Sequence, residues 1–339
     1  MHILPNKIYK KGDRLSTLFL PYLYRHNTVE WLLKMKKVLL IAGGGTLGTY
    51  VAEELLYLGH GVDIICLEDK KSDCDNLKYY KADANLDFLR NIFKKNHYNG
   101  IVNFIHYRNY EDYIPYHELL SQNTEHLIFL SSYRVYADLQ HPITETAPQL
   151  IDVIKDPLFH KMEDYALAKS RAERFLNNNS YPKNWTIVRP VISFSDRRLD
   201  INMVSGHTVI DAANKGMTIQ LPLEAKKLTA GLDWAGNSGK LIANLLFKED
   251  CMGEAYTISS AQNITWEDVA DIYTKLLNVQ FEWIAANYSH NVWIWYYDRA
   301  YDRKIDNSKV LKATGLNPQT FKSIEEGIKF ELKKLGAIE

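Results

Sequence analysis

The sequence predicts an α/β fold in which helices cover both faces of a mostly parallel sheet, followed by a smaller α/β region. Short apolar runs of strand length alternate with helical patterns between residues 38 and 189. A glycine-rich turn follows the first of these runs, and the alternation breaks after Pro190. Strands that alternate with helices are typical of a parallel sheet wound on both sides.

The first half of the chain contains six expected strands. Each is a short apolar run, at 38–42, 62–67, 79–82, 101–105, 127–131 and 185–189. Helical patterns separate most of them, around 49–58, 86–95, 113–121 and 164–177. Length and apolar spacing distinguish the two kinds of segment.

The second half reads differently. Its expected helices lie at 202–215, 238–247, 266–277 and 324–335, with a strand at 254–259. We therefore predict three parts: an N-terminal extension at 1–35, the doubly wound domain at 36–190, and a smaller, partly interleaved domain at 191–339.

Composition excludes several classes of protein. Hydrophobic residues make up 46% and charged residues 24% of the 339, as in ordinary globular proteins. Lys+Arg and Asp+Glu balance at 41 each, so there is no basic field for nucleic acid. No apolar run approaches the roughly 18–20 residues of a membrane span. The three cysteines show no metal-like spacing, and their small, odd number indicates reduced thiols and a cytoplasmic location.

The N-terminal extension allows three interpretations. Four basic residues, the last of them Arg14, precede a short apolar stretch at 15–24. A signal peptide has such a start, but no small-residue cleavage site follows here. The segment is otherwise a peripheral extension, or Met35 is the natural start of the protein.

The turn after the first strand has the pattern G-x-G-x-x-G and opens a helix. Glycines there permit a tight turn and a close approach of the backbone to a pyrophosphate, and the helix N-terminus attracts the anion. A glycine turn without a ligand is the alternative, but the strand before it and the helix after it favour a Rossmann-type dinucleotide site. Its expected residues are Gly43, Gly45, Thr46, Leu47 and Gly48.

An acidic pair, Glu68 and Asp69, ends the second expected strand. A carboxylate at this distance from the glycines can bind the ribose hydroxyls, which would favour NAD, and we choose Glu68 for this role. The alternative is a solvated run of charges at the end of a strand. Lys70 and Lys71 follow directly, so NADP is not excluded. Asp83, after the third strand, could contact the adenine amino group.

Tyr165 and Lys169 lie four residues apart, and Tyr165 is the only one of 22 tyrosines followed by lysine at that spacing. On a helix the two side chains share one face. A tyrosine titrates near ~10, and a nearby positive charge favours its phenolate. A tyrosine tuned in this way can exchange a proton with an alcohol or a carbonyl during hydride transfer.

With these residues in place, the chain resembles the extended short-chain dehydrogenase/reductase family, which includes NAD-dependent epimerases, dehydratases and reductases of nucleotide sugars. The resemblance runs from about residue 36 to residue 336. The matching segments are Ser131–Tyr136 (Ser-Ser-x-x-Val-Tyr), Tyr165-x-x-x-Lys169, Arg189-Pro190, the strand at 253–260 and a C-terminal run at 306–327.

The resemblance implies roles for three residues. Tyr165 would be the general acid/base. Lys169 would lower the pKa of Tyr165 and hold the nicotinamide ribose, and Ser132 would hydrogen-bond the reacting oxygen. The dehydratases of the family carry Thr-Asp-Glu where this chain has Ser132-Tyr133-Arg134, which favours epimerisation or reduction of a keto group.

Some positions depart from the family pattern. Ala42 replaces the first loop glycine, and Ile105 replaces an alanine near the nicotinamide. Ile192 stands where the family has an asparagine that contacts the sugar nucleotide. The segment before Leu127 is short, so the helix-mediated homodimer of the family is only a possible partner arrangement.

For the substrate side, the resemblance places cations near a diphosphate. The candidates are Lys227, Arg299 and Arg303. Arg134, next to the catalytic serine, is a separate candidate that meets an anionic group of the substrate or forms a surface salt bridge. The aromatic run at 293–297 either packs in the core or at a dimer surface, or stacks on a base or sugar. We expect a nucleotide sugar as substrate, with no metal, nucleic acid or membrane involved. The alternatives are an NAD(P)-binding regulator or scaffold, and a reductase of a smaller keto or hydroxy compound.

Overall fold

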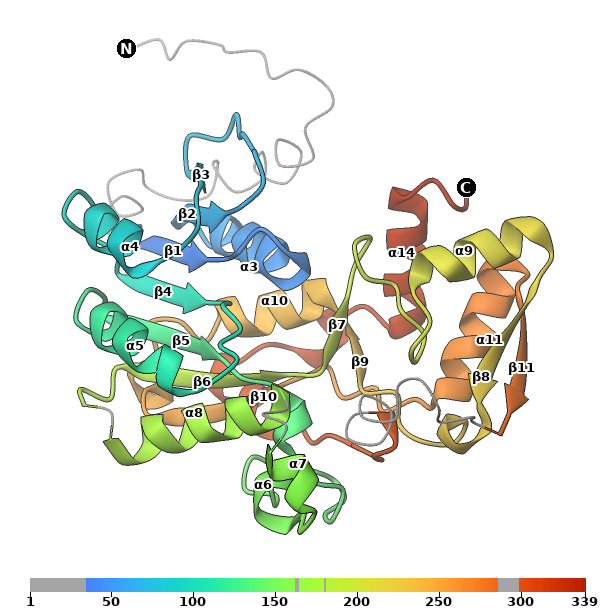
Figure 1. The fold of residues 1–339 in the computed structure, drawn as a ribbon. Coiled ribbons are helices and arrows are strands. Elements are labelled where there is room, and N and C mark those ends of the chain that lie inside the picture. Colours follow the sequence, from blue (N-terminus) through green and yellow to red (C-terminus); the bar gives the residue numbers. More distant parts are fainter. Residues whose placement is uncertain (1–34, 162–164, 180, 286–298) are drawn as a thin grey trace.

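The computed structural model describes residues 35–161, 165–179, 181–285 and 299–339 (Figure 1). The basic leader and the aromatic run at 293–297 lie outside the described residues. Of the described helices, none is both long enough and apolar enough to cross a membrane.

The larger part of the molecule is built on a seven-stranded sheet in which every strand pair is parallel. Its order is β10-β6-β5-β4-β1-β2-β3. The strands are β1 (Lys37–Ile41), β2 (Gly61–Cys66), β3 (Leu77–Lys81), β4 (Gly100–Asn103), β5 (His126–Leu130), β6 (Trp185–Pro190) and β10 (Glu254–Ile258). This confirms the predicted Rossmann-type α/β class. The order reverses between β1 and β4, and ligands bind at the carboxyl ends of the strands beside such a switch.

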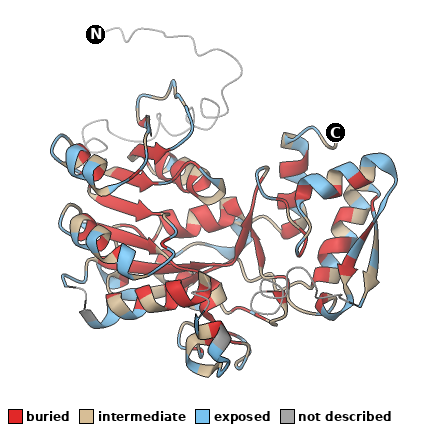
Figure 2. Cartoon of the chain, in the orientation of Figure 1, coloured by how far each residue is buried: buried red, intermediate tan, exposed pale blue. Residues whose placement is uncertain are grey.

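Helices cover both faces of this sheet. They are α3 (Thr46–Tyr57), α4 (Leu86–Phe93), α5 (Ile114–Ser121), α8 (Tyr165–Asn179), α10 (Ala235–Ala243) and α13 (Ser308–Thr314). Strand β1 shows why: Val38 and Leu40 pack in one core with residues of α3 and α10, whereas Leu39 and Ile41 pack in another with residues of α4, α5 and α8. The sheet is therefore buried on both sides, as Figure 2 shows.

The smaller part carries two short parallel sheets. They pair β7 (Ile192–Phe194) with β9 (Leu232–Trp234) and β8 (Thr218–Pro222) with β11 (Gln280–Ile284). Their helices are α9 (Gly206–Lys215), α11 (Trp266–Leu277) and α14 (Ile324–Lys334). Short helices α6 (Leu150–Val153) and α7 (Pro157–Lys161) lie below the large sheet in Figure 1. These four short strands were not predicted, because the regular alternation of strands and helices, which marks the strands of the first half, ends at Pro190.

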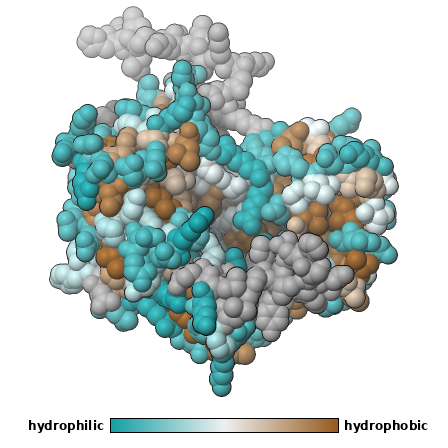
Figure 3. All heavy atoms as spheres, in the orientation of Figure 1, coloured by the Kyte–Doolittle hydropathy of each residue, from teal (hydrophilic) through white to brown (hydrophobic). Residues whose placement is uncertain are grey.

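The two parts are interleaved, as the sequence suggested. Strand β10 and helix α10 follow residue 190, yet β10 pairs with β6 and α10 packs on the larger sheet beside α3. Hydrophilic residues dominate the face in Figure 3, with apolar residues scattered among them. The division into domains at residues 35 and 190 stays a prediction.

Candidate active site

The glycine turn leads from β1 into α3, and its glycines have different surroundings. A Cβ on Gly48 would lie 2.3 Å from the carbonyl oxygen of Gly43, and one on Gly43 would lie 2.6 Å from Leu40 Cβ. A Cβ on Gly45 would meet nothing within 4 Å. Gly43 and Gly48 therefore allow the turn to pack on itself, whereas Gly45 leaves space in front of the N-terminus of α3. That space suits a pyrophosphate bound by the first N–H groups of the helix.

Charged side chains surround the edge of this turn. Glu68 lies just past β2, and Arg197 Nη1 is 3.7 Å from its Oε1. Arg197 and Lys70 both donate to the carbonyl oxygen of Gly44, at 2.6 and 2.8 Å. A backbone hydrogen bond, aided by Lys70 and Arg197, holds the pKa of Glu68 below its usual value. An ionised carboxylate suits ribose hydroxyls, and the adjacent cations suit a 2′-phosphate. Asp83 is exposed in the segment after β3.

Helix α8 begins at Tyr165 and carries Lys169 one turn later. Lys169 is 2% exposed, and its Nζ donates to the carbonyl oxygen of Leu130 at 2.6 Å. The same Nζ lies 5.7 Å from the ring centroid of Tyr165. Burial lowers the pKa of Lys169 to about 7, against the opposing effect of Glu173. The lysine therefore titrates near neutral pH directly beside the tyrosine.

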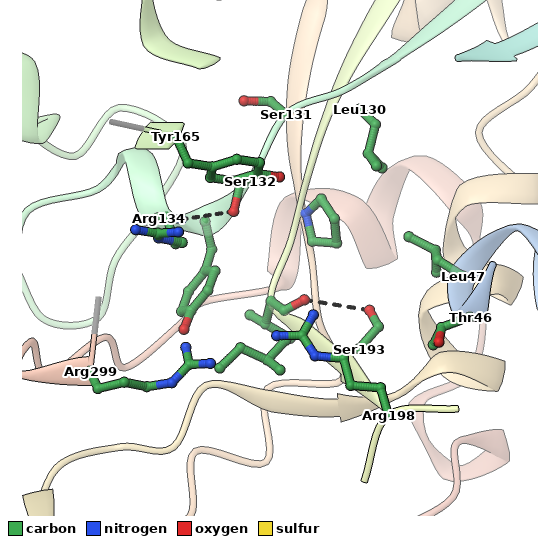
Figure 4. A pocket seen from close by; sticks show the side chains of 14 residues that line it. Thr46, Leu47, Leu130, Ser131, Ser132, Arg134, Tyr165, Ser193, Arg198 and Arg299 are labelled. Atoms are coloured by element: carbon green, nitrogen blue, oxygen red, sulfur yellow. Dashed lines mark hydrogen bonds between the residues drawn. The ribbon is translucent and has the colours of Figure 1, made fainter. Parts of the chain in front are cut away.

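Three further groups gather around Tyr165. The ring of His106 lies 4.7 Å from its ring, centroid to centroid. The guanidinium carbon of Arg134 lies 5.1 Å from the Tyr165 centroid. Ser132 Oγ accepts a hydrogen bond from the backbone N–H of Arg134 at 3.2 Å. Figure 4 shows Tyr165, Ser132 and Arg134 together on one side of a pocket, with Thr46 and Leu47 on the opposite side.

A buried ion pair supports this arrangement from behind. Arg189 donates from Nε and Nη2 to the carboxylate of Glu173, at 2.9 and 2.6 Å. Ser131 Oγ also donates to Glu173, which fixes α8 against the end of β5. Glu173 was not among the predicted site residues, although it follows Lys169 by four residues and so lies on the same helix face.

The pocket itself has a volume of about 350 Å³. Its walls come from the start of α3, the ends of β5 and β6, the start of α8, and the smaller part of the molecule. Six of the predicted residues line it: Thr46, Leu47, Ser132, Arg134, Tyr165 and Arg299. The other eight lining residues were not predicted as site residues. They are Leu130, Ser131, Tyr133, Pro190, Val191, Ile192, Ser193 and Arg198. Ile192, noted only as a departure, is part of the wall.

Two predicted substrate residues lie elsewhere. Lys227 is an exposed side chain that forms an ion pair with Glu267 on α11. Arg303 is buried behind the pocket, where its Nε donates to the carbonyl oxygen of Tyr136 at 3.1 Å and its guanidinium lies 5.2 Å from the ring of Tyr133. The structure therefore does not bring these two cations to the pocket wall.

Within the described part of the chain, no group of three His, Cys, Asp or Glu side chains is placed to hold a metal ion. The three cysteines, Cys66, Cys74 and Cys251, are free thiols.

No protein-family model and no curated protein matches this sequence. Solved structures do match. UDP-glucose 4-epimerase of Thermotoga maritima with UDP-glucose has a TM-score of 0.66 at 14% identity, over 88% of this chain and 98% of that one. The Thermus thermophilus UDP-glucose 4-epimerase complex with NAD has a TM-score of 0.63 at 16% identity, over 88% and 98%.

A third match is the Bordetella bronchiseptica enzyme WbmG in complex with NAD and UDP, with a TM-score of 0.66 at 15% identity, over 90% of this chain and 97% of that one. Identities this low establish a shared fold and no more. The fold extends over nearly the whole length of each of these proteins. The protein therefore has the fold of the NAD-dependent epimerases of the extended short-chain dehydrogenase/reductase family.

Proposed function

We propose that the protein is an NAD-dependent enzyme that epimerises a nucleotide sugar or reduces its keto form, with Tyr165 as general acid/base. One observation carries the proposal. A single cavity of about 350 Å³ is lined both by the start of the helix that follows the glycine turn and by Ser132 and Tyr165. A dinucleotide on the turn and a substrate at Tyr165 would therefore meet in one space.

The residues present fit a nicotinamide dinucleotide. The open space at Gly45 and the N-terminus of α3 would hold its pyrophosphate, and Glu68 its adenosine ribose. When bound, the nicotinamide would supply hydride exchange with a substrate carbon. Complexes of the Thermus and Bordetella proteins with NAD support NAD as the first choice of cofactor. NADP is tested as well, because Lys70 and Arg197 beside Gly44 suit a 2′-phosphate.

The chain itself supplies the proton chemistry. Tyr165 Oη would take the proton of a substrate hydroxyl, or return one to a carbonyl oxygen. Ser132 Oγ would hydrogen-bond that same oxygen and stabilise its developing charge. Lys169 lies beside the Tyr165 ring, and its protonated amino group would favour the phenolate of Tyr165. General acid/base help of this kind contributes roughly 10²–10⁴ in rate.

The decisive experiment is Tyr165→Phe, with Tyr181→Phe as a matched control because Tyr181 is 91% exposed. We expect Tyr165→Phe to lower turnover by roughly 10²–10⁴ while affinity for NAD stays within a factor of two. Thermal-shift screening against NAD, NADP and UDP-, GDP-, CDP- and dTDP-sugars identifies the substrate for the assay.

Each alternative has its own outcome. Near-normal turnover by Tyr165→Phe would refute the catalytic proposal. Stabilisation by a dinucleotide but by no nucleotide sugar favours a smaller keto or hydroxy substrate. Dinucleotide binding without turnover of any ligand that binds favours a regulator or scaffold.

A further inference from the structure

The carbonyl oxygen of Gly44, in the middle of the glycine turn, accepts hydrogen bonds from two cations that belong to different parts of the molecule. Lys70 follows β2 and donates from Nζ at 2.8 Å. Arg197 belongs to the loop after β7, in the smaller part, and donates from Nη1 at 2.6 Å. Gly44 is buried, and a Cβ on it would lie 2.6 Å from Cys66 Cβ, so the turn also packs closely on the end of β2.

The two cations are held at this oxygen against their mutual repulsion. Burial, and after it the charge of Arg197, lowers the pKa of Lys70. Glu68 offsets part of the repulsion, since its Oε1 lies 3.7 Å from Arg197 Nη1. The loop of Arg197 contacts the turn at a second point. There Ser195 Oγ accepts a hydrogen bond from the backbone N–H of Arg197 at 3.2 Å and donates to Thr46 Oγ1 at 3.1 Å. Both cations are therefore part of the structure of the turn.

These hydrogen bonds set the direction of the next N–H group. The peptide between Gly44 and Gly45 is trans and planar, so its carbonyl oxygen and its N–H point in opposite directions. With the carbonyl held toward Lys70 and Arg197, the Gly45 N–H points away from them. Gly45 is the exposed N-cap of α3, so this N–H has no acceptor inside the helix and borders the open space at the turn. Cations at the carbonyl also polarise the peptide and strengthen its N–H as a donor.

We infer that Lys70 and Arg197 are positioning residues for the dinucleotide, because they hold the peptide after Gly44 so that the Gly45 N–H is directed at the pyrophosphate. This inference rests on the proposed function, which puts the pyrophosphate at Gly45. NAD and NADP carry the same pyrophosphate, so the effect is the same for both. A direct contact of these cations with a 2′-phosphate would instead act on NADP alone. Since Arg197 comes from the smaller part, that part helps to form the cofactor site as well as the substrate pocket.

The test measures the affinities of NAD, NADP, ADP and adenosine for the full chain by isothermal titration calorimetry, with adenosine in competition with ADP. We expect Arg197→Met and Lys70→Met each to weaken NAD, NADP and ADP by a similar factor of about tenfold. Adenosine has no phosphate and should change by less than about twofold. Arg197→Lys should recover most of the affinity, since it keeps a charged donor. Lys275→Met, which removes a charge from an exposed ion pair on α11, is the control and should change none of the four affinities.

Three results would overturn the inference and leave the proposed function intact. Unchanged NAD affinity in both single variants and in the double variant means that the peptide keeps its direction without the cations. A loss confined to NADP assigns the two cations to the 2′-phosphate. An equal loss of adenosine and ADP means that they support the adenosine site or the fold in general. If the wild-type protein binds neither NAD nor NADP, the proposed function and this inference are both wrong.

Discussion

Lys169 places an amino group where a charge is unfavourable, because its side chain is almost fully buried. Burial lowers its pKa to about 7, whereas an unfolded lysine titrates near ~10.4. Between these values the unfolded chain binds more protons than the folded one. The contribution of Lys169 to stability therefore rises with pH through this window and is least favourable at pH 7 and below.

The residue-scale prediction follows from that sign. Lys169→Met should gain thermal stability relative to wild type as the pH falls from 10 to 7, by a few °C in the difference between their midpoints. Scanning calorimetry of both proteins without cofactor, at pH 7, 8.5 and 10, measures this difference. Using the difference cancels the titration of the groups that Lys169 does not influence, and a difference that does not change with pH would contradict the assignment.

At the scale of one element, the glycine turn separates packing from binding. Gly48 is in the first turn of α3, where any Cβ would overlap the carbonyl of Gly43. Gly45 has an extended backbone, with φ of −84°, and open space where its Cβ would be. An alanine is therefore sterically possible at Gly45 but not at Gly48 without moving the backbone.

We expect Gly48→Ala to lower the free energy of unfolding by about 1–3 kcal/mol, as other overpacking substitutions do. Gly45→Ala should change it by less than about 1 kcal/mol yet weaken dinucleotide binding at least tenfold, because the methyl group enters the space proposed for the pyrophosphate. Urea unfolding and titration with NAD separate the two effects. Normal NAD affinity in Gly45→Ala would place the pyrophosphate elsewhere.

At the scale of the whole molecule, Glu331 joins the two parts. This carboxylate on α14 is fully buried and accepts hydrogen bonds from Tyr50 of α3, from Trp234 Nε1 of β9 at 2.7 Å and from the backbone N–H of Asp196 at 2.9 Å. Burial and the bond to Glu331 raise the pKa of Tyr50, so its hydroxyl stays a donor. One side chain thus connects α14 with α3, with β9 and with the loop that carries Arg197.

Glu331→Leu should therefore be among the more damaging single changes. It leaves three donors without their acceptor, at about 1–3 kcal/mol each, so we expect a loss of at least about 3 kcal/mol in the free energy of unfolding. Glu325→Leu on the same helix is the control, because its ion pair with Lys275 is exposed and worth less than about 1 kcal/mol. If urea unfolding shows a similar loss in the free energy of unfolding for both variants, Glu331 does not hold the two parts together.

The sequence by itself determined the fold class, the glycine turn and the Tyr165/Lys169 spacing, because each depends on residues that are close along the chain. Long alternating segments carry enough periodicity to be recognised, whereas β7 and β9, of three residues each, do not. The roles assigned to Ser132, Tyr165 and Lys169 stay predictions.

Only the tertiary structure decided which cations reach the pocket. Arg134, Lys227, Arg299 and Arg303 were all candidates in sequence, yet Lys227 points to solvent and Arg303 is buried behind the wall. Arg198, which no pattern marked, lines the pocket instead. The physical reason is the parallel sheet, which brings the carboxyl ends of distant strands to one edge and leaves the choice of neighbours there to the connections between them.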